Sequence, residues 1–74
     1  MNVEYEKNLG KNLKMLRENA NLTQEVLSVQ FQLRGCDLTR SAVAKIEVGQ
    51  RHIYPDEIKL FKQILNVAYD DIFI

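Results

Sequence analysis

Side chains that could perform catalysis are few and scattered along this chain. His52 is the only histidine and Cys36 the only thiol, and neither has a partner at the spacing of a known catalytic or metal-binding motif. Asp70 and Asp71 are adjacent, but neighbouring residues of a helix point to different sides, so a solvated acidic end is expected. The sequence therefore predicts no enzyme, no metal site and no cofactor, and Cys36 is expected to be a spectator.

A second set of polar side chains follows Leu38, in the stretch LTRSAVAKIEVGQR. On a helix that begins at Arg40, one face consists of Ser41, Ala44, Lys45 and Val48. The opposite face carries Val43 and Ile46, which are suited to a core. Arginine can donate two hydrogen bonds to O6 and N7 of guanine, and the major groove of DNA admits one α-helix. The spacing thus favours a helix that enters a groove with Arg40 near its leading end.

Three helix starts share one local pattern, which makes their positions credible. An apolar residue precedes the cap and another follows at the fourth helical position, the spacing of a hydrophobic staple. The three starts are Leu22-Thr23, Leu38-Thr39 and Ile53-Tyr54-Pro55. Threonine is a good N-cap, and proline suits the first position of a helix.

Helical periodicity accounts for nearly the whole chain, and no segment alternates at a period of two residues. A first helix carries an apolar stripe of Tyr5, Leu9, Leu13 and Leu16 and fades at Asn19 to Asn21. Further helices are predicted for Gln24 to about Arg34, Arg40 to Val48, Pro55 to Asn66 and Tyr69 to Phe73. The expected core residues are Leu27, Phe31, Val43, Ile46, Ile58, Phe61, Ile64 and Leu65. The predicted fold class is all-α, a compact bundle of four to five short helices.

Length and composition fit one small domain over residues 1–74, with 46% hydrophobic and 27% charged residues. The net charge is zero, which argues against a strongly basic coat for nucleic acid. Eight of the ten basic residues lie in residues 1–54, however, so a local basic patch is still expected. No apolar run is long enough to span a membrane, no signal peptide is evident, and one cysteine fits the cytoplasm.

Three segments together resemble the lambda-repressor-like (Xre-type) helix-turn-helix domain. They are LGKNLKMLRENANLTQEVLSVQF, LTRSAVAKIEVGQR and NVAYDDIF, and the resemblance covers about residues 7–73. It implies a sequence-specific regulator of transcription, expected to be a repressor, that binds double-stranded DNA as a homodimer. No membrane partner and no small-molecule ligand are expected.

The resemblance also implies roles for individual residues. The positions that match DNA contacts are Gln24, Thr39, Arg40, Ser41, Ala44, Lys45, Gln50 and Arg51. Gln24, Gln50 and Arg51 match contacts to the DNA backbone, while Thr39 matches the cap of the recognition helix. Arg17 and Glu47 match two positions that form an internal salt bridge in many relatives.

One departure from the family pattern lies between the core residue Phe31 and Leu38. Relatives make this connection with a single turn residue, whereas this chain has QLRGCD. We expect about one extra turn of the second helix, through Arg34, followed by a loop that starts at Gly35. Arg34 is either a phosphate contact or a solvated cation.

Two alternatives stay open at this point. The neutral total charge favours a protein-interaction module with the same fold, for example the control half of a toxin–antitoxin pair. The apolar C-terminus, Ile72, Phe73 and Ile74, either closes the core or forms the dimer interface, and we expect these residues to mediate dimerisation. His52 is expected in a loop, with a phosphate contact as the alternative.

Overall fold

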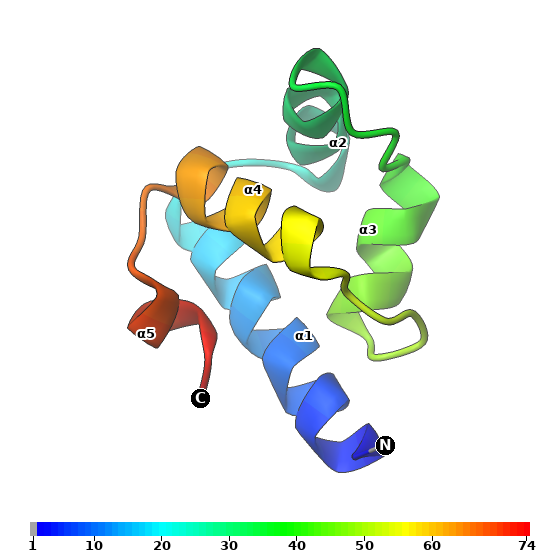
Figure 1. Ribbon diagram of the computed structural model, residues 1–74, viewed down its shortest axis with the longest axis vertical. Coiled ribbons are helices and arrows are strands. Elements are labelled where there is room, and N and C mark those ends of the chain that lie inside the picture. Colours follow the sequence, from blue (N-terminus) through cyan, green and yellow to red (C-terminus); the bar gives the residue numbers. More distant parts are fainter. Residues whose placement is uncertain (1) are drawn as a thin grey trace.

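The computed structural model describes residues 2–74 and contains five helices (Figure 1). They are α1 (Val3–Asn19), α2 (Gln24–Leu33), α3 (Arg40–Glu47), α4 (Pro55–Leu65) and α5 (Tyr69–Ile72). Within residues 2–74 no strand is present, so the all-α prediction is confirmed. In the described part of the chain, no helix combines the length and the apolar character needed to cross a membrane.

The predicted helix starts are confirmed by their caps. The Thr23 hydroxyl accepts a hydrogen bond from the Val26 N–H at 3.1 Å, and the Thr39 hydroxyl accepts one from the Ala42 N–H at 3.1 Å. Each bond satisfies one of the free N–H groups that begin a helix. At the start of α4 the capping group is the Glu57 carboxylate, which accepts a hydrogen bond from the Tyr54 N–H at 3.0 Å.

The helices α1, α2 and α3 end in the same way, with a residue in the left-handed region. These residues are Asn21 (φ 59°), Gly35 (φ 80°) and Gly49 (φ 78°). At Gly35, the Gly35 N–H donates to the Gln32 carbonyl and the Cys36 N–H donates to the Phe31 carbonyl, the paired bonds of a Schellman motif. The second helix therefore gains its expected extra turn and stops where glycine permits the reversal.

The core gathers apolar side chains from all five helices and from Leu38. Its fully buried members include Leu13, Leu27, Phe31, Val43, Ile46, Phe61 and Ile72. The Phe31 and Phe61 rings meet edge to face, with their centroids 4.8 Å apart. Two expected core residues, Ile58 and Ile64, are only partly buried, and Tyr5, the first residue of the apolar stripe of α1, is exposed.

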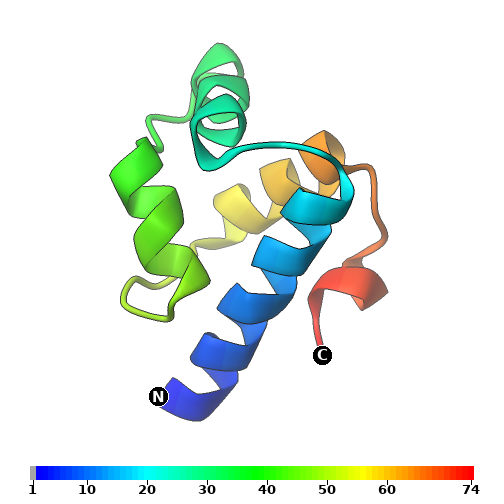
Figure 2. The same ribbon diagram turned by 180° about the vertical axis from the view of Figure 1, so that it is seen from behind.

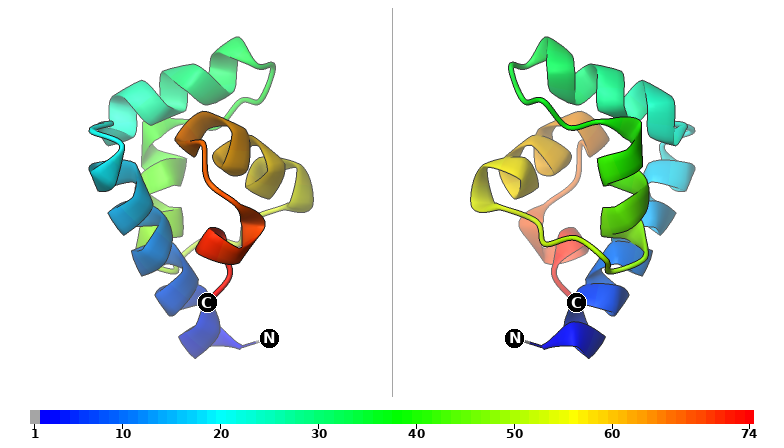
Figure 3. Two further views of the ribbon diagram at one scale, coloured as in Figure 1. Left: turned by 90° about the vertical axis from the view of Figure 1, so that its left-hand side faces the viewer. Right: turned by 90° about the vertical axis from the view of Figure 1, so that its right-hand side faces the viewer.

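The helices α2 and α3 are consecutive and cross at a steep angle, with α3 on the outside of the molecule (Figures 1 and 3). The helix α1 passes beside the C-terminal end of α3 (Figure 2), and α4 packs against α2. The inner side of α3 contributes Val43 and Ile46 to the core, while its other side stays open to solvent.

The C-terminal residues divide between the core and the surface. The amide Nδ2 of Asn12 donates to the carbonyls of Asp71 at 2.7 Å and Ile72 at 2.8 Å, which fixes α5 on α1. Ile72 is fully buried, whereas Phe73 and Ile74 are 44% and 60% exposed. The expectation that Ile72 lies in a dimer interface was wrong, because this side chain completes the core of its own chain.

Candidate functional site

The outer face of α3 presents hydrogen-bond donors to solvent. Arg40, Ser41 and Lys45 are exposed, and Ala44 between them is half-buried. Within residues 2–74, none of the three donor side chains forms a hydrogen bond or an ion pair. Val43 and Ile46 on the other side of the helix are buried, as predicted. This helix is anchored on one side and has free donors on the other.

The connection that leads into α3 is fixed rather than loosely attached. The buried Ser28 hydroxyl donates to the Leu38 carbonyl at 2.7 Å, and the Leu38 side chain is buried in the core. Thr39 then caps α3 through its hydroxyl, so its predicted position at the cap is observed. The lengthened connection after Phe31 therefore still delivers Arg40 to the start of α3 in a defined orientation.

The Arg17–Glu47 pair is present and joins α1 to α3. Arg17 Nε donates to Glu47 Oε2 at 2.7 Å and Arg17 Nη2 donates to Glu47 Oε1 at 3.2 Å. Both side chains are buried, and the hydrogen bond from the guanidinium to Glu47 raises the pKa of Arg17. Arg17 Nη1 also donates to the Leu22 carbonyl at 2.7 Å, so the cation orders the turn before α2.

Gln24 completes this network at the start of α2. Its Nε2 donates to Glu47 Oε1 at 2.9 Å, so one carboxylate receives donors from both α1 and α2. An amide nitrogen has two hydrogens, and the second remains available to a partner outside the chain. The bond to Glu47 was not predicted, although its effect is to orient a residue whose expected role is a phosphate contact.

A close backbone approach lies next to this network. A Cβ added at Gly10 of α1 would lie 2.2 Å from the Ile46 carbonyl oxygen and 2.9 Å from the Glu47 carbonyl oxygen. Only glycine permits α1 and α3 to approach so closely. Sequence reasoning missed this role, because a glycine in a helix carries no signal that distinguishes tight packing from tolerance.

Arg51 is engaged within the chain by contacts that were not predicted. Its Nη1 and Nη2 donate to the two carboxylate oxygens of Glu57, both at 2.9 Å, and Nη1 also donates to the His52 carbonyl at 2.8 Å. The guanidinium lies over the Tyr54 ring, 5.5 Å from its centroid. The structure therefore gives Arg51 a structural role in closing the loop between α3 and α4.

Glu57 is the buried partner that sequence reasoning missed. Burial by itself would raise the pKa of this carboxyl, but hydrogen bonds from Arg51 and from the Tyr54 N–H lower it below its ordinary value. The charged form is thus the one that the fold stabilises. A glutamate three residues after the cap residue Tyr54 was the available signal, because this is the N3 position of a capping box.

Of the other loop residues, Gln50 is exposed, and Nδ1 of His52 pairs with the Glu6 carboxylate of α1. Arg34, at the end of α2, donates from Nη1 to the Gln30 backbone carbonyl at 3.0 Å and to the Gln30 Oε1 at 2.8 Å. The Arg34 side chain is therefore held against its own helix. Gln50 alone of these projects freely from the loop.

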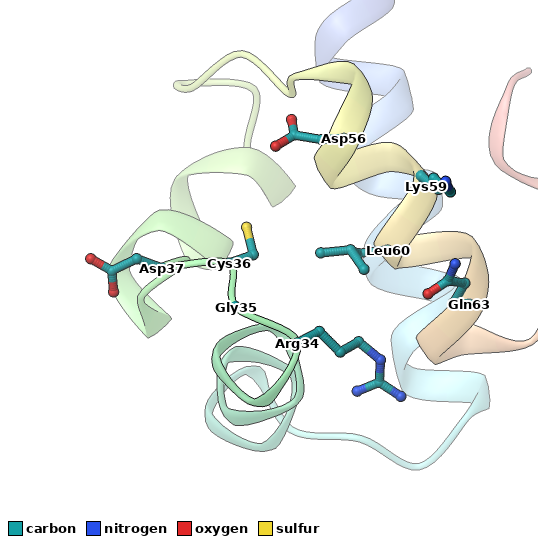
Figure 4. A pocket seen from close by; sticks show the side chains of 8 residues that line it. All are labelled: Arg34, Gly35, Cys36, Asp37, Asp56, Lys59, Leu60 and Gln63. Atoms are coloured by element: carbon teal, nitrogen blue, oxygen red, sulfur yellow. The ribbon is translucent and has the colours of Figure 1, made fainter.

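A groove between the end of α2 and α4 contains the thiol, and Figure 4 shows the side chains that line it. Leu60 points across the groove toward Cys36, Asp37 points away from it, and Arg34 and Gln63 lie at the other end of the groove from Asp56. Burial, together with the negative charges of Glu57 and Asp56, raises the pKa of the Cys36 thiol. A raised pKa disfavours the reactive thiolate. Within residues 2–74, no three His, Cys, Asp or Glu side chains gather as metal ligands.

Two solved structures resemble this chain over nearly its whole length. The crystal structure of the DNA-binding domain of BldD matches over 100% of both chains, with a TM-score of 0.84 and 22% identity. The restriction-modification controller protein C.AhdI from Aeromonas hydrophila matches over 96% of both chains, with a TM-score of 0.82 and 27% identity. No protein-family profile and no curated protein sequence matches the chain. The fold is that of a lambda-repressor-like (Xre-type) helix-turn-helix domain.

Proposed function

We propose that this chain is a sequence-specific regulator of transcription that binds double-stranded DNA with α3 in the major groove. The observation that carries the proposal is the free donor face of α3, where Arg40, Ser41 and Lys45 have no partner within residues 2–74. The two similar structures support it, since one is described as a DNA-binding domain and the other as a controller protein. The proposal gives the chain no catalytic role and no cofactor.

Each part of the proposed interface has a definite task. Arg40 pairs with guanine O6 and N7, while Ser41 and Lys45 contact neighbouring base edges or phosphates. The small side chain of Ala44 lets the backbone of α3 approach the bases. Gln24 uses its second amide hydrogen on a phosphate, and Gln50 contacts the DNA backbone from the loop.

We further propose that the chain represses transcription as a homodimer in the cytoplasm. Phe73 and Ile74 support the dimer, because they are exposed apolar side chains next to the anchored helix α5. A two-fold dimer would read two half-sites centred about 34–36 Å apart, one turn of DNA. Repression follows if such a site overlaps a promoter.

An alternative function is supported by a different observation. The outer face of α2 exposes Val26, Val29 and Leu33, the last by 73%, and the net charge of the chain is zero. Both features suit a protein-interaction or antitoxin-type module. Selection from a random duplex library by gel shift at low salt separates the two functions. Enrichment of a common sequence supports the regulator, and no retarded duplex at any salt concentration supports the interaction module.

A further inference from the structure

The lysines of α1 form a stripe whose charge the rest of the chain does not balance. Lys7, Lys11 and Lys14 are exposed and lie three or four residues apart, so they share one side of the helix. No carboxylate of residues 2–74 lies within 4.0 Å of any of the three ammonium groups, since the ion pairs are Arg17–Glu47, Arg51–Glu57 and His52–Glu6. We call these three residues the α1 lysine stripe.

This arrangement costs the isolated helix some stability. Like charges three or four residues apart destabilise a helix by about 0.2–0.5 kcal/mol per pair. Lys7 with Lys11, and Lys11 with Lys14, are two such pairs, and Glu4 and Glu18, one turn beyond the two ends of the stripe, offset part of this repulsion. An anionic partner outside the chain would remove this repulsion.

The stripe lies beside the C-terminal end of α3. A groove of about 390 Å³ between the two helices is lined by the stripe together with Glu4, Asn8, Glu47 and Val48. Val48 is exposed and follows Ser41 and Lys45 along the outer side of α3, so the groove opens onto the donor face. The stem of Lys7 is packed over Gly49, because a Cβ added there would lie 2.7 Å from the Lys7 Cγ.

Glu47 does not cancel the charge of the stripe. Its carboxylate is buried and already accepts donors from Arg17 and Gln24. The acidic group that remains at the groove is Glu4, at the N-terminal end of α1. One exposed carboxylate beside three exposed ammonium groups leaves the groove positive.

The dimensions of the stripe suit the sugar-phosphate backbone. Lys7 and Lys14 are separated by seven residues, or about 10.5 Å of helix at 1.5 Å per residue. Phosphates of one DNA strand follow one another every ~3.4 Å along the duplex axis. A helix about 10–12 Å wide fills a major groove about 12 Å wide, so an element beside it meets the groove wall, which is phosphate.

We propose that the α1 lysine stripe is a second binding surface, which holds the phosphates of the DNA strand that borders the major groove beside the C-terminal end of α3. This inference rests on the proposed DNA binding of α3 and adds a contact that carries affinity without sequence preference. The duplex would be held from two sides of α3, by Gln24 at the start of α2 and by the stripe on α1.

The test measures binding of a library-selected duplex and of a random-sequence duplex at several salt concentrations. The variants are Lys7→Gln, Lys11→Gln, Lys14→Gln and the triple variant, and Lys59→Gln on α4 is a control with the same charge change. Each stripe lysine lost should reduce the salt slope by about 0.9, which is about eightfold in affinity at 0.1 M salt. The loss should be equal for both duplexes, and the melting temperature should not fall.

Three results would overturn the inference while leaving the proposed function intact. The first is an unchanged salt slope in the triple variant, and the second is an equal loss in Lys59→Gln. The third is a lower melting temperature with an unchanged slope, which would mean that the lysines only complement the C-terminal dipole of α3. A wild-type chain that binds no duplex at low salt overturns the proposed function and this inference together.

Discussion

Arg17 Nε lies 2.7 Å from Glu47 Oε2, and this contact joins the end of α1 to the last residue of α3. Both side chains are buried, and Gln24 donates to the same carboxylate from the start of α2. The three helices that would meet DNA are thus connected through one acidic group. Its energetic role can be separated from any role in binding.

Replacing Glu47 with alanine should lower the free energy of unfolding by about 3–5 kcal/mol. The guanidinium of Arg17 would keep its burial and lose the carboxylate that compensates for it, which is the costly way to break a buried pair. Urea denaturation measures the change. The double variant Arg17→Met/Glu47→Leu is the control, because it removes both charges and should recover most of the loss. A Glu47→Ala variant within 1 kcal/mol of wild type would show that the pair is not structural.

Alanine substitutions at two glycines separate the energetic effect of close packing from that of backbone conformation. Gly10→Ala should cost about 3 kcal/mol, because the new Cβ would meet the Ile46 carbonyl and α1 would have to move away from α3. Gly35→Ala should cost about 1–2 kcal/mol, since its φ of 80° is strained for alanine while nothing lies within 4 Å of the added atom. Thermal melts of both variants provide the comparison. Equal losses would contradict the close contact at Gly10.

Acid should destabilise the fold partly through Glu57. Its pKa in the folded chain is lower than the ordinary value of 4.5, so the unfolded chain binds the proton first as the pH falls. This stabilisation is complete above pH ~4.5 and is lost as the pH falls through the lower, folded pKa. Unfolding free energies measured between pH 7 and pH 2 should therefore fall less steeply for Glu57→Gln. Parallel curves for the variant and the wild type would reject this account.

The helix starts and stops could be predicted from the sequence because they depend on local chemistry. Thr23 and Thr39 cap their helices, and Gly35 and Gly49 end them, through contacts within five residues along the chain. The extra turn of α2 followed from the same rules, with Gly35 as its stop. Such contacts are visible in a sequence because the partners are neighbours in it.

Long-range partners were predicted only where a resemblance supplied them. The Arg17–Glu47 pair came from the family pattern, whereas the bonds from Gln24 to Glu47 and from Arg51 to Glu57 did not. The sequence gives no sign of the buried carboxylate that the fold places beside Arg51. Ile72 was misjudged for the same reason, since an apolar C-terminus does not reveal which of its residues has a cavity to fill.

Self-association should depend on Phe73 and Ile74 and not on Ile72. The double variant Phe73→Ser/Ile74→Ser should weaken dimerisation with little effect on the melting temperature, because both side chains are exposed. Ile72→Ala should instead cost about 2–5 kcal/mol of stability, the usual loss for a buried isoleucine. Sedimentation at micromolar concentration measures the first effect and urea denaturation the second. A serine double variant that dimerises as wild type would place the interface elsewhere.

Alanine substitutions of the two arginines on either side of Gly49, Arg40 and Arg51, should have different effects. Arg40 is free and exposed at the start of α3, so Arg40→Ala should cost about 1–3 kcal/mol on the best duplex and flatten its preference at one or two positions. The melting temperature should be unchanged. Binding isotherms on the selected duplex and on single-base variants of it measure both the affinity and the preference. Unaltered binding by Arg40→Ala would refute the assignment of α3 as the recognition helix.

Arg51→Ala should act through the fold instead. Removing the guanidinium takes two of the three donors from the buried Glu57 carboxylate and leaves the Tyr54 N–H, so the unfolding free energy should fall by about 1.5–3 kcal/mol. At a temperature where the variant is folded, its salt slope for DNA should equal that of wild type, because no phosphate contact is lost. A slope reduced by about 0.9 with an unchanged melting temperature would mean that Arg51 leaves Glu57 for a phosphate when DNA binds.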